Sequence, residues 1–185
     1  MKVIRAVVVM GVAGSGKTLV GRALADRLGW TFVDGDDHHP EANRAKMAAG
    51  VPLTDADRWP WLDRLRALLD DARARGAGVV LACSALKASY RERLGAGDPR
   101  LAFVFLDGDP AVIAARLAAR RGHYMPPSLL DSQIATLERP ADALRVDVDA
   151  DPAVVVATTL DALARLDGER VAAPDGTPAA PEEVP

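Results

Sequence analysis

The residues near the amino terminus form a loop that is typical of phosphate binding. Residues 11–18 read GVAGSGKT and fit the pattern G-x-x-x-x-G-K-[ST] without a gap. Glycines let the backbone N–H groups of such a loop converge on phosphate oxygens, and the helix that follows adds the positive end of its dipole. We expect Lys17 to reach the β- and γ-phosphates of a nucleotide and Thr18 to offer its hydroxyl to Mg²⁺. The predicted nucleotide-binding loop consists of Gly11, Val12, Ala13, Gly14, Ser15, Gly16, Lys17 and Thr18.

This loop predicts nucleotide binding but not the reaction, because GTPases, motor ATPases and passive nucleotide sensors share it. A GTPase of the Ras kind needs an Asn-Lys-x-Asp segment, which the sequence lacks. A typical motor ATPase carries an acid at the end of a later core strand, whereas residues 79–84 read VVLACS. The sequence therefore favours neither of these two classes.

Acidic residues follow the second expected strand instead. Residues 34–37 read DGDD, and small-molecule phosphotransferases use carboxylates there to hold the hydrated metal and to align or deprotonate the substrate hydroxyl. We expect Asp34 to contact Mg²⁺, partly through water, and Asp36 to act on the hydroxyl as aligner or base. Two alternatives stay open: the two aspartates exchange these roles, or the segment is simply an acidic turn.

Short apolar runs alternate with helical periods along the chain. Strands are expected at 3–10, 30–33, 78–82, 101–106 and 146–148. Helices are expected at 17–28, 40–49, 61–74, 85–94, 110–121, 128–137 and 152–166. Ser128 is the expected N-cap of the sixth helix. Because the strands are apolar runs rather than half-polar alternations, the pattern predicts an α/β fold in which helices cover both faces of a parallel sheet.

The composition is that of an ordinary globular chain, with 185 residues, 49% hydrophobic residues and a formal net charge of -3. No excess of Lys and Arg points to a nucleic-acid or anionic-membrane partner. The single cysteine, Cys83, excludes an internal disulfide and a multi-cysteine metal site. No apolar run is long enough to span a membrane, so we expect a cytoplasmic protein. We expect one domain over residues 1–168 and a flexible tail at 169–185.

Four segments carry a more specific pattern. They are MGVAGSGKT at 10–18, DGDDHHPEANRAKMAAGVPLTDADRWPWL at 34–62, ACSALKASYRERL at 82–94 and RLAARRGHYMPPSLLDSQIATLERP at 116–140. In these segments the chain closely resembles the gluconokinase family, the ATP:D-gluconate 6-phosphotransferases. The resemblance spans roughly residues 7–165, and related kinases such as shikimate kinase share the loop but not the long second segment. His38 departs from the family pattern, which usually has an apolar or aromatic residue there.

The resemblance implies a P-loop kinase fold, with a five-stranded parallel sheet, a helical substrate-binding region and a mobile lid. It implies that ATP with Mg²⁺ is the phosphoryl donor and that 6-phosphogluconate is the product. A homodimer is an expectation by analogy with related enzymes. Two rivals stay open: another small-metabolite kinase of the shikimate-kinase-like kind, and a non-catalytic module that senses ATP.

Gluconate is a small polyol with a carboxylate at one end, so its site needs hydrogen-bonding groups for the hydroxyls and a cation for the acid. The bidentate guanidinium of Arg58 suits the carboxylate, unless Arg58 forms a surface salt bridge with Asp55 or Asp57. The residues expected to contact gluconate are Asp36, His39, Lys46, Arg58, Ser84, Lys87, Arg91 and Gln133.

Several of these residues have a second interpretation. His39 either faces the substrate or caps the next helix. Lys46 either reaches the substrate or pairs with Glu41 or Asp55. A solvated surface position also stays open for Lys46 and for Lys87.

Residues after the third expected strand point to the same side of the sheet. Ligands of open α/β sheets bind beyond the carboxyl ends of the strands. Ser84, Lys87 and Arg91 follow such an end, and we therefore expect them near the substrate.

Arginines mark the place where a lid is expected, at about residues 120–130. A kinase must exclude water from its site, and a lid arginine that closes on the phosphates also stabilises transition-state charge. We expect Arg116 and Arg120, which are one helical turn apart, to bind the nucleotide. Arg120 is then catalytic together with Lys17 and Asp36, although a solvated basic helix end stays open as the alternative.

Overall fold

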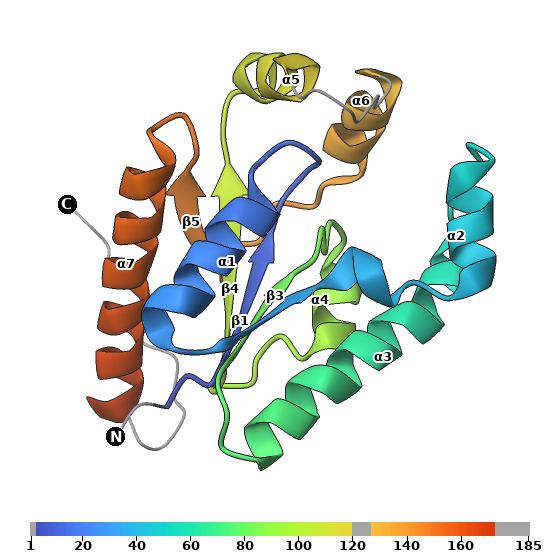
Figure 1. The fold of residues 1–185 in the computed structure, drawn as a ribbon. Coiled ribbons are helices and arrows are strands. Elements are labelled where there is room, and N and C mark those ends of the chain that lie inside the picture. The colour runs from blue at the N-terminus through green and yellow to red at the C-terminus, as the bar shows by residue number, and fades with distance from the viewer. Residues whose placement is uncertain (1–2, 120–126, 173–185) are drawn as a thin grey trace.

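Five parallel strands form the centre of the computed structural model, which describes residues 3–119 and 127–172. The strands are β1 (Ala6–Met10), β2 (Thr31–Asp34), β3 (Val79–Ala82), β4 (Leu101–Asp107) and β5 (Leu144–Asp147). The helices are α1 (Lys17–Leu28), α2 (Glu41–Ala48), α3 (Asp55–Ala74), α4 (Ala88–Leu94), α5 (Pro110–Ala119), α6 (Pro127–Thr136), α7 (Pro152–Ala172) and the short 3-10 helix η1 (Gly35–His38). The strand order across the sheet is β2-β3-β1-β4-β5 (Figure 1). The expected α/β fold with a five-stranded parallel sheet is confirmed.

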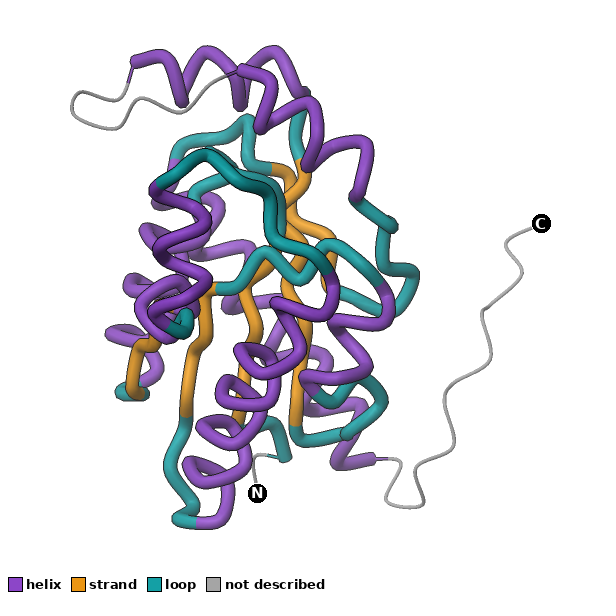
Figure 2. The backbone as a smooth tube through the Cα atoms, turned by 90° about the vertical axis from the view of Figure 1, so that its right-hand side faces the viewer, coloured by secondary structure: helices purple, strands orange, loops and turns teal. Residues whose placement is uncertain are grey.

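Helices cover both faces of the sheet (Figures 1 and 2), and two clusters of buried hydrophobic residues hold them in place. Successive side chains of a strand point to opposite faces. Val7 and Val9 of β1 accordingly join the core that α1 and α7 share. Val8 and Met10 join the core that α3 and α4 share. Because both faces are covered, β1 is apolar at every position, which explains why the sequence shows it as an unbroken run.

Helix α3 begins six residues earlier than the sequence predicts, at Asp55 instead of residue 61. The side chain of Thr54 accepts from the N–H of Asp57, and the Asp57 carboxylate accepts from the N–H of Thr54. This capping box satisfies two of the free donors at the helix start. The helix continues through Pro60, which lies inside it and removes one hydrogen bond, and its residues Trp61, Leu62 and Leu65 are buried in the core. The 34–62 segment is therefore more helical than expected, and it brings the start of α3 toward η1.

Other boundaries differ by a few residues. Helix α4 begins at Ala88 rather than at residue 85, because Ala85 has a left-handed φ of 44°. Helix α6 begins at Pro127, so Ser128 lies inside it and is not its N-cap. Helix α7 continues to Ala172, past the domain boundary expected at 168, and residues 173–185 of the expected tail lie outside the described residues. None of the helices in the described ranges is both long and apolar enough to cross a membrane.

The capping box makes a prediction about stability. Thr54→Ala removes the acceptor of the Asp57 N–H, so we expect the free energy of unfolding to fall by about 1 kcal/mol. Thr54→Ser keeps a hydroxyl and is expected to stay within about 0.5 kcal/mol of the wild type. Urea unfolding followed by circular dichroism measures both variants. Equal stability of the alanine and serine variants would show that the capping box does not hold the start of α3.

Candidate active site

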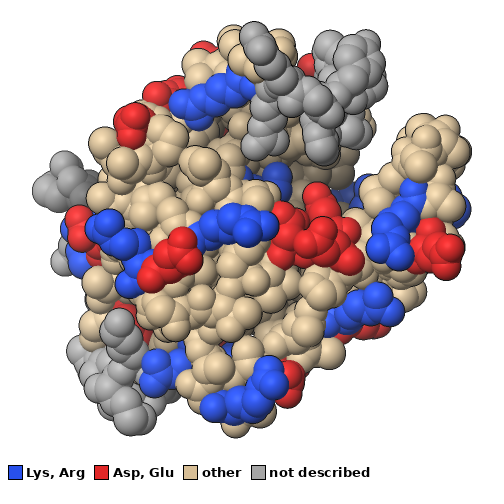
Figure 3. All heavy atoms as spheres, viewed as in Figure 1, with Lys and Arg blue, Asp and Glu red and all other residues tan. Residues whose placement is uncertain are grey.

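A cavity of about 320 Å³ lies where β1, β2 and β3 end. Gly14, Lys17 and Thr18 line it from the loop after β1, and Asp34 and Asp36 line it from the end of β2. Figure 3 shows acidic side chains gathered in the region where Figure 1 places η1. The wall of the cavity therefore combines the phosphate-binding loop with carboxylates. The carboxyl end of an open parallel sheet is also the usual place for a ligand in this fold class.

Glycines shape the loop at residues 11–18, which we call the P-loop. Gly11, Gly14 and Gly16 have φ angles of 144°, 81° and 96°, a region that favours glycine. A Cβ at Gly11 would lie 2.8 Å from the carbonyl oxygen of Leu106. The loop thus approaches β4 too closely for a side chain at that position.

Polar groups of the P-loop fit a bound phosphate. Nζ of Lys17 donates to the carbonyl oxygen of Val12 at 3.0 Å, which holds the ammonium group over the loop. The Ser15 side chain is buried, and its Oγ has no hydrogen-bond partner within the described part of the chain. Helix α1 begins at Lys17 with no side chain that caps it and no acid in its first turn. A cation, an available hydroxyl and open helix N–H groups suit an anion.

Thr18 and Asp34, the two residues expected at Mg²⁺, lie side by side. Oγ1 of Thr18 donates to Oδ2 of Asp34 at 3.0 Å, and Oδ1 of Asp34 accepts from the N–H of Asp36 at 3.2 Å. Hydroxyl and carboxylate oxygens are the ligands that Mg²⁺ prefers. The residues present therefore fit a magnesium ion at the mouth of the P-loop.

His39 lies behind the acids and is buried, with 6% of its surface exposed. Its ring stacks on Trp61 at a centroid distance of 4.1 Å, and Nε1 of Trp61 donates to the carbonyl oxygen of Gly35 at 2.8 Å. Burial lowers the pKa of His39, an effect that Asp36 opposes, so the imidazole is neutral at pH 7. His39 does not cap the next helix, since Pro40 precedes α2 and α2 has no side-chain cap.

A cluster of charged and aromatic side chains adjoins the start of α3. Nζ of Lys87 donates to both carboxylate oxygens of Asp55 at 2.8 and 2.9 Å, and the Tyr90 hydroxyl donates to Oδ1 at 2.5 Å. The hydrogen bond from Lys87, followed by that from Tyr90, lowers the pKa of Asp55. The guanidinium of Arg58 donates to the carbonyl oxygen of Leu53 and lies 5.7 Å from the Tyr90 ring centre. Lys87 is therefore the ion-pair partner of Asp55.

Two alternatives that the sequence left open at the start of α3 are not found among the described residues. The ion pairs of the described residues do not join Arg58 to Asp55 or Asp57. Lys46 pairs with Asp57 at 2.7 Å, and not with Glu41 or Asp55. The hydrogen bond from Lys46, with those from Thr54, lowers the pKa of Asp57 to about 2. Asp57 thus joins α2 to the capping box of α3.

Three other expected site residues have definite partners. Gln133 lies at the P-loop, because its Oε1 accepts from the N–H of Ala13 at 2.6 Å and it lines the cavity. Arg91 is buried and turns toward the backbone, donating to the carbonyl oxygens of Ala85 and Leu86 at 3.0 and 3.1 Å. Nη1 of Arg116 donates to the carbonyl oxygen of Val148 at 2.5 Å, at the end of β5. Ser84 lines the cavity, as expected. Arg120 and residues 121–126 of the expected lid lie outside the described residues.

Sequence reasoning missed Tyr90 as a member of the cluster. Tyr90 stands three residues after Lys87, a spacing that places two side chains on one helix face and was the available signal. It also missed that Gln133 serves the P-loop, because no local pattern ties α6 to a loop more than a hundred residues away in sequence.

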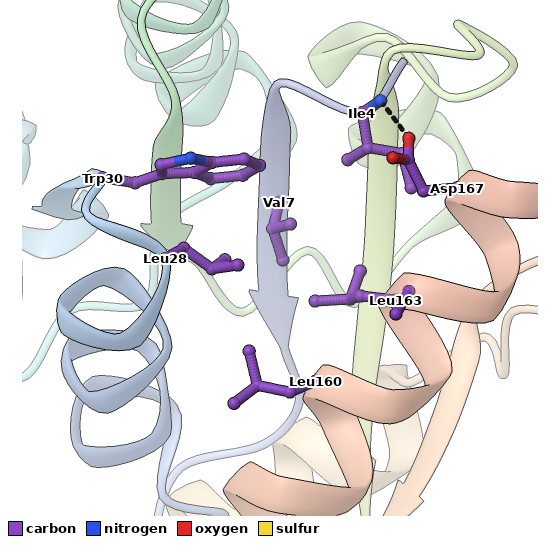
Figure 4. A pocket seen from close by; sticks show the side chains of 8 residues that line it. Ile4, Val7, Leu28, Trp30, Leu160, Leu163 and Asp167 are labelled. Carbon is purple, nitrogen blue, oxygen red and sulfur yellow. Dashed lines mark hydrogen bonds between the residues drawn. The ribbon is translucent and has the colours of Figure 1, made fainter. Parts of the chain in front are cut away.

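A second, smaller pocket of about 80 Å³ lies toward the amino end of β1, between α1 and α7 (Figure 4). Aliphatic side chains and Trp30 line it, and Asp167 stands at its edge. Oδ1 of Asp167 accepts from the N–H groups of Val3 and Ile4 at 2.7 Å. The carboxylate therefore anchors the start of β1 to α7, and the pocket lacks the cations that a phosphate needs.

Comparisons with known proteins agree with this geometry. A family model described as an AAA domain matches residues 7–140. The gluconokinase of Gluconobacter oxydans is 52% identical over 155 residues, which cover 82% of this chain and 87% of that protein. The thermosensitive gluconokinase of Escherichia coli is 42% identical over 174 residues, which cover 92% of this chain and 93% of that protein.

Solved structures show the same similarity. The crystal structure of a gluconokinase from Sinorhizobium meliloti 1021 has a TM-score of 0.82 at 45% identity, covering 92% of this chain and 98% of that chain. A shikimate kinase from Bacteroides thetaiotaomicron has a TM-score of 0.60 at 20% identity, covering 86% of this chain and 98% of that chain. The second likeness shows a common fold and nothing finer.

The burial of Cys83, which follows β3, belongs to a hydrophobic core and has 1% of its surface exposed, leads to a prediction about its reactivity. Burial raises the pKa of its thiol to about 12, so the thiol stays protonated at pH 8. The thiolate is the nucleophile that reacts with alkylating reagents. We expect iodoacetamide to leave the folded protein unmodified and to label its one cysteine only in denaturing urea, as mass spectrometry can measure. Rapid labelling of the folded protein would contradict the burial of this strand end.

Proposed function

Since the chain belongs to the gluconokinase family of P-loop kinases, we propose that its 320 Å³ cavity is the place where the γ-phosphoryl group of ATP passes to the 6-hydroxyl of D-gluconate. The activity is that of a gluconokinase, an ATP-dependent carbohydrate kinase. The roles of individual residues in the reaction are our proposal. The observation that carries it is that the P-loop, Asp34 and Asp36 line one cavity, with Thr18 and Asp34 in direct contact.

The P-loop side of the cavity holds the triphosphate. Its backbone N–H groups and the start of α1 face the phosphates, and Ser15 supplies a hydroxyl that has no partner among residues 3–119 and 127–172. The ammonium group of Lys17 stabilises negative charge on the β- and γ-phosphates as it develops in transfer. Gln133 keeps the loop in shape by accepting the Ala13 N–H.

Thr18 and Asp34 are the proposed holders of Mg²⁺, Asp34 partly through water. When bound, the ion neutralises charge on the phosphate oxygens. Asp34 also accepts the N–H of Asp36, so the same carboxylate fixes the first turn of η1.

Asp36 is the proposed partner of the 6-hydroxyl. It stands on η1 across the cavity from Lys17, and a carboxylate there aligns the hydroxyl and accepts its proton as the new O–P bond forms. The transfer is direct, from ATP to the hydroxyl, with no phosphorylated enzyme. His39, neutral and stacked on Trp61, supports η1 from behind.

The cluster at the start of α3 is the proposed site for the rest of the sugar acid. Arg58 and Lys87 supply cations for the carboxylate of gluconate, and Ser84 adds a hydroxyl at the cavity wall. Arg116 and Arg120 stay proposed contacts of the nucleotide. A homodimer and a cytoplasmic location are further proposals, the first by analogy with related enzymes.

A panel of acceptors with γ-³²P-labelled ATP tests the function. D-Gluconate is expected to be phosphorylated, whereas shikimate and nucleosides are expected to stay unlabelled. Labelling of shikimate or a nucleoside beside inert gluconate would favour a different small-metabolite kinase. ATP binding without any labelled acceptor would favour a nucleotide sensor.

A pair of variants tests Asp36. Asp36→Asn removes the proton acceptor, so we expect kcat with gluconate to fall about 10²–10⁴-fold while ATP binding by calorimetry is retained. Asp37→Asn removes the same charge from the same turn and serves as the control, with a loss of less than about tenfold. Similar losses in the two variants would reduce the role of Asp36 to the general charge of η1.

A further inference from the structure

The turn that follows α6 is anchored to three parts of the structure. Leu137 packs against both hydrophobic cores. Nη1 of Arg139 donates to Oδ2 of Asp107 at 2.5 Å, and this carboxylate at the end of β4 is only 7% exposed. Glu138 stands between them and contacts residues 86–88. The turn therefore holds Glu138 on both sides.

Glu138 forms two hydrogen bonds with the segment at residues 86–88. Its N–H donates to the carbonyl oxygen of Leu86 at 2.9 Å, and its Oε2 accepts from the N–H of Ala88 at 2.7 Å. The second contact joins a carboxylate to the first residue of α4, which makes it a charge-assisted hydrogen bond. Lys87 lies between the two contacts, so Glu138 determines the direction in which the backbone presents Lys87.

The segment before α4 needs such support. Ala85 has a φ of 44°, which is uncommon for a residue with a Cβ and costs energy that the surroundings must offset. Arg91 donates from the protein interior to the carbonyl oxygen of Ala85 at 3.0 Å. Arg91 and Glu138 thus hold the segment from two sides. The result is the ion pair of Lys87 with Asp55 at 2.8 Å.

Helix α6 is fixed at the nucleotide side as well. Gln133, five residues before Glu138, accepts the N–H of Ala13 in the P-loop at 2.6 Å. Residues 133–138 therefore touch both the P-loop and the segment that carries Lys87. Because Gln133 holds the P-loop through its own contact, loss of the Glu138 side chain leaves that contact in place.

We propose that Glu138 is a positioning residue of the gluconate site, which acts by holding residues 86–88 so that Lys87 stays beside Asp55. The inference rests on the proposed function, because it takes Lys87 as a residue of the gluconate-binding site. Glu138 acts through the backbone of its neighbours, and its removal weakens gluconate binding while ATP binding is retained.

Steady-state kinetics of Glu138→Ala test the inference. We expect the KM for gluconate to rise about tenfold, with kcat and the KM for ATP within about twofold of the wild type. Glu138→Gln keeps an oxygen that accepts the Ala88 N–H and is expected to restore most of the lost affinity. The control is Glu92→Ala, which removes an exposed glutamate from α4, the helix whose first residue Glu138 contacts. Its kcat and its KM values for gluconate and ATP are expected to be unchanged. If the alanine variant does not fold, Glu138→Asp shortens the carboxylate and is expected to raise the same KM.

A double variant shows whether Glu138 acts through Lys87. If it does, Glu138→Ala combined with Lys87→Ala has a KM for gluconate no more than about twofold above that of Lys87→Ala alone. The inference would be overturned if the increases in the KM for gluconate caused by Glu138→Ala and Lys87→Ala multiplied in the double variant. It would also be overturned if Glu138→Ala had the same KM for gluconate as Glu92→Ala. A wild-type protein that fails to phosphorylate gluconate would instead overturn the proposed function, so the two failures are distinguishable.

Discussion

The hydrogen bond between Thr18 and Asp34, at 3.0 Å, joins the two halves of the candidate active site. Thr18 is on the first turn of α1, after β1, whereas Asp34 ends β2, and β3 lies between these two strands. Neighbouring strands are about 4.8 Å apart, so roughly 10 Å of sheet separates the two elements. The P-loop must turn back over the sheet before α1 begins for the hydroxyl to reach the carboxylate. Glycines with positive φ at 11, 14 and 16 make that turn possible. The opposition of phosphate-binding groups and acids across the cavity depends on this one arrangement.

The acceptor side is built on the long second segment rather than on the sheet itself. The capping box at Thr54 starts α3 early, and Trp61, about two turns later, supports η1 through the carbonyl oxygen of Gly35. His39 stacks on Trp61, and burial lowers the pKa of its imidazole. Apolar packing therefore holds a turn rich in acids at the edge of the cavity. At the start of α3, Asp55 forms an ion pair with Lys87, the residue before α4, and this ion pair links α3 to α4.

Local patterns predict the parts of this structure that are local. The apolar runs predict the parallel sheet because both of its faces are covered, and the P-loop is predicted because eight consecutive residues form it. The start of α3 is not predictable from periodicity, since Pro60 argues against a helix, whereas in the folded chain the Thr54–Asp57 cap and the burial of Trp61, Leu62 and Leu65 favour one. The ion-pair partner of Lys46 is not predictable from the sequence either, because several acidic residues are close to it in sequence. Tertiary packing determines that the partner is Asp57. Arg91 points inward for the same kind of reason, since the left-handed turn at Ala85 presents the carbonyl oxygens of Ala85 and Leu86, which the sequence does not reveal.

A crystal structure with a non-hydrolysable ATP analogue, Mn²⁺ and gluconate tests the central claim most directly, because anomalous scattering locates the metal without ambiguity. The account predicts the metal beside Oγ1 of Thr18, bound to Asp34 directly or through one water, with the triphosphate along the P-loop. It also predicts the 6-hydroxyl of gluconate within hydrogen-bond distance of Asp36. A metal remote from Thr18 and Asp34, or a gluconate whose 6-hydroxyl faces away from Asp36, would contradict the account.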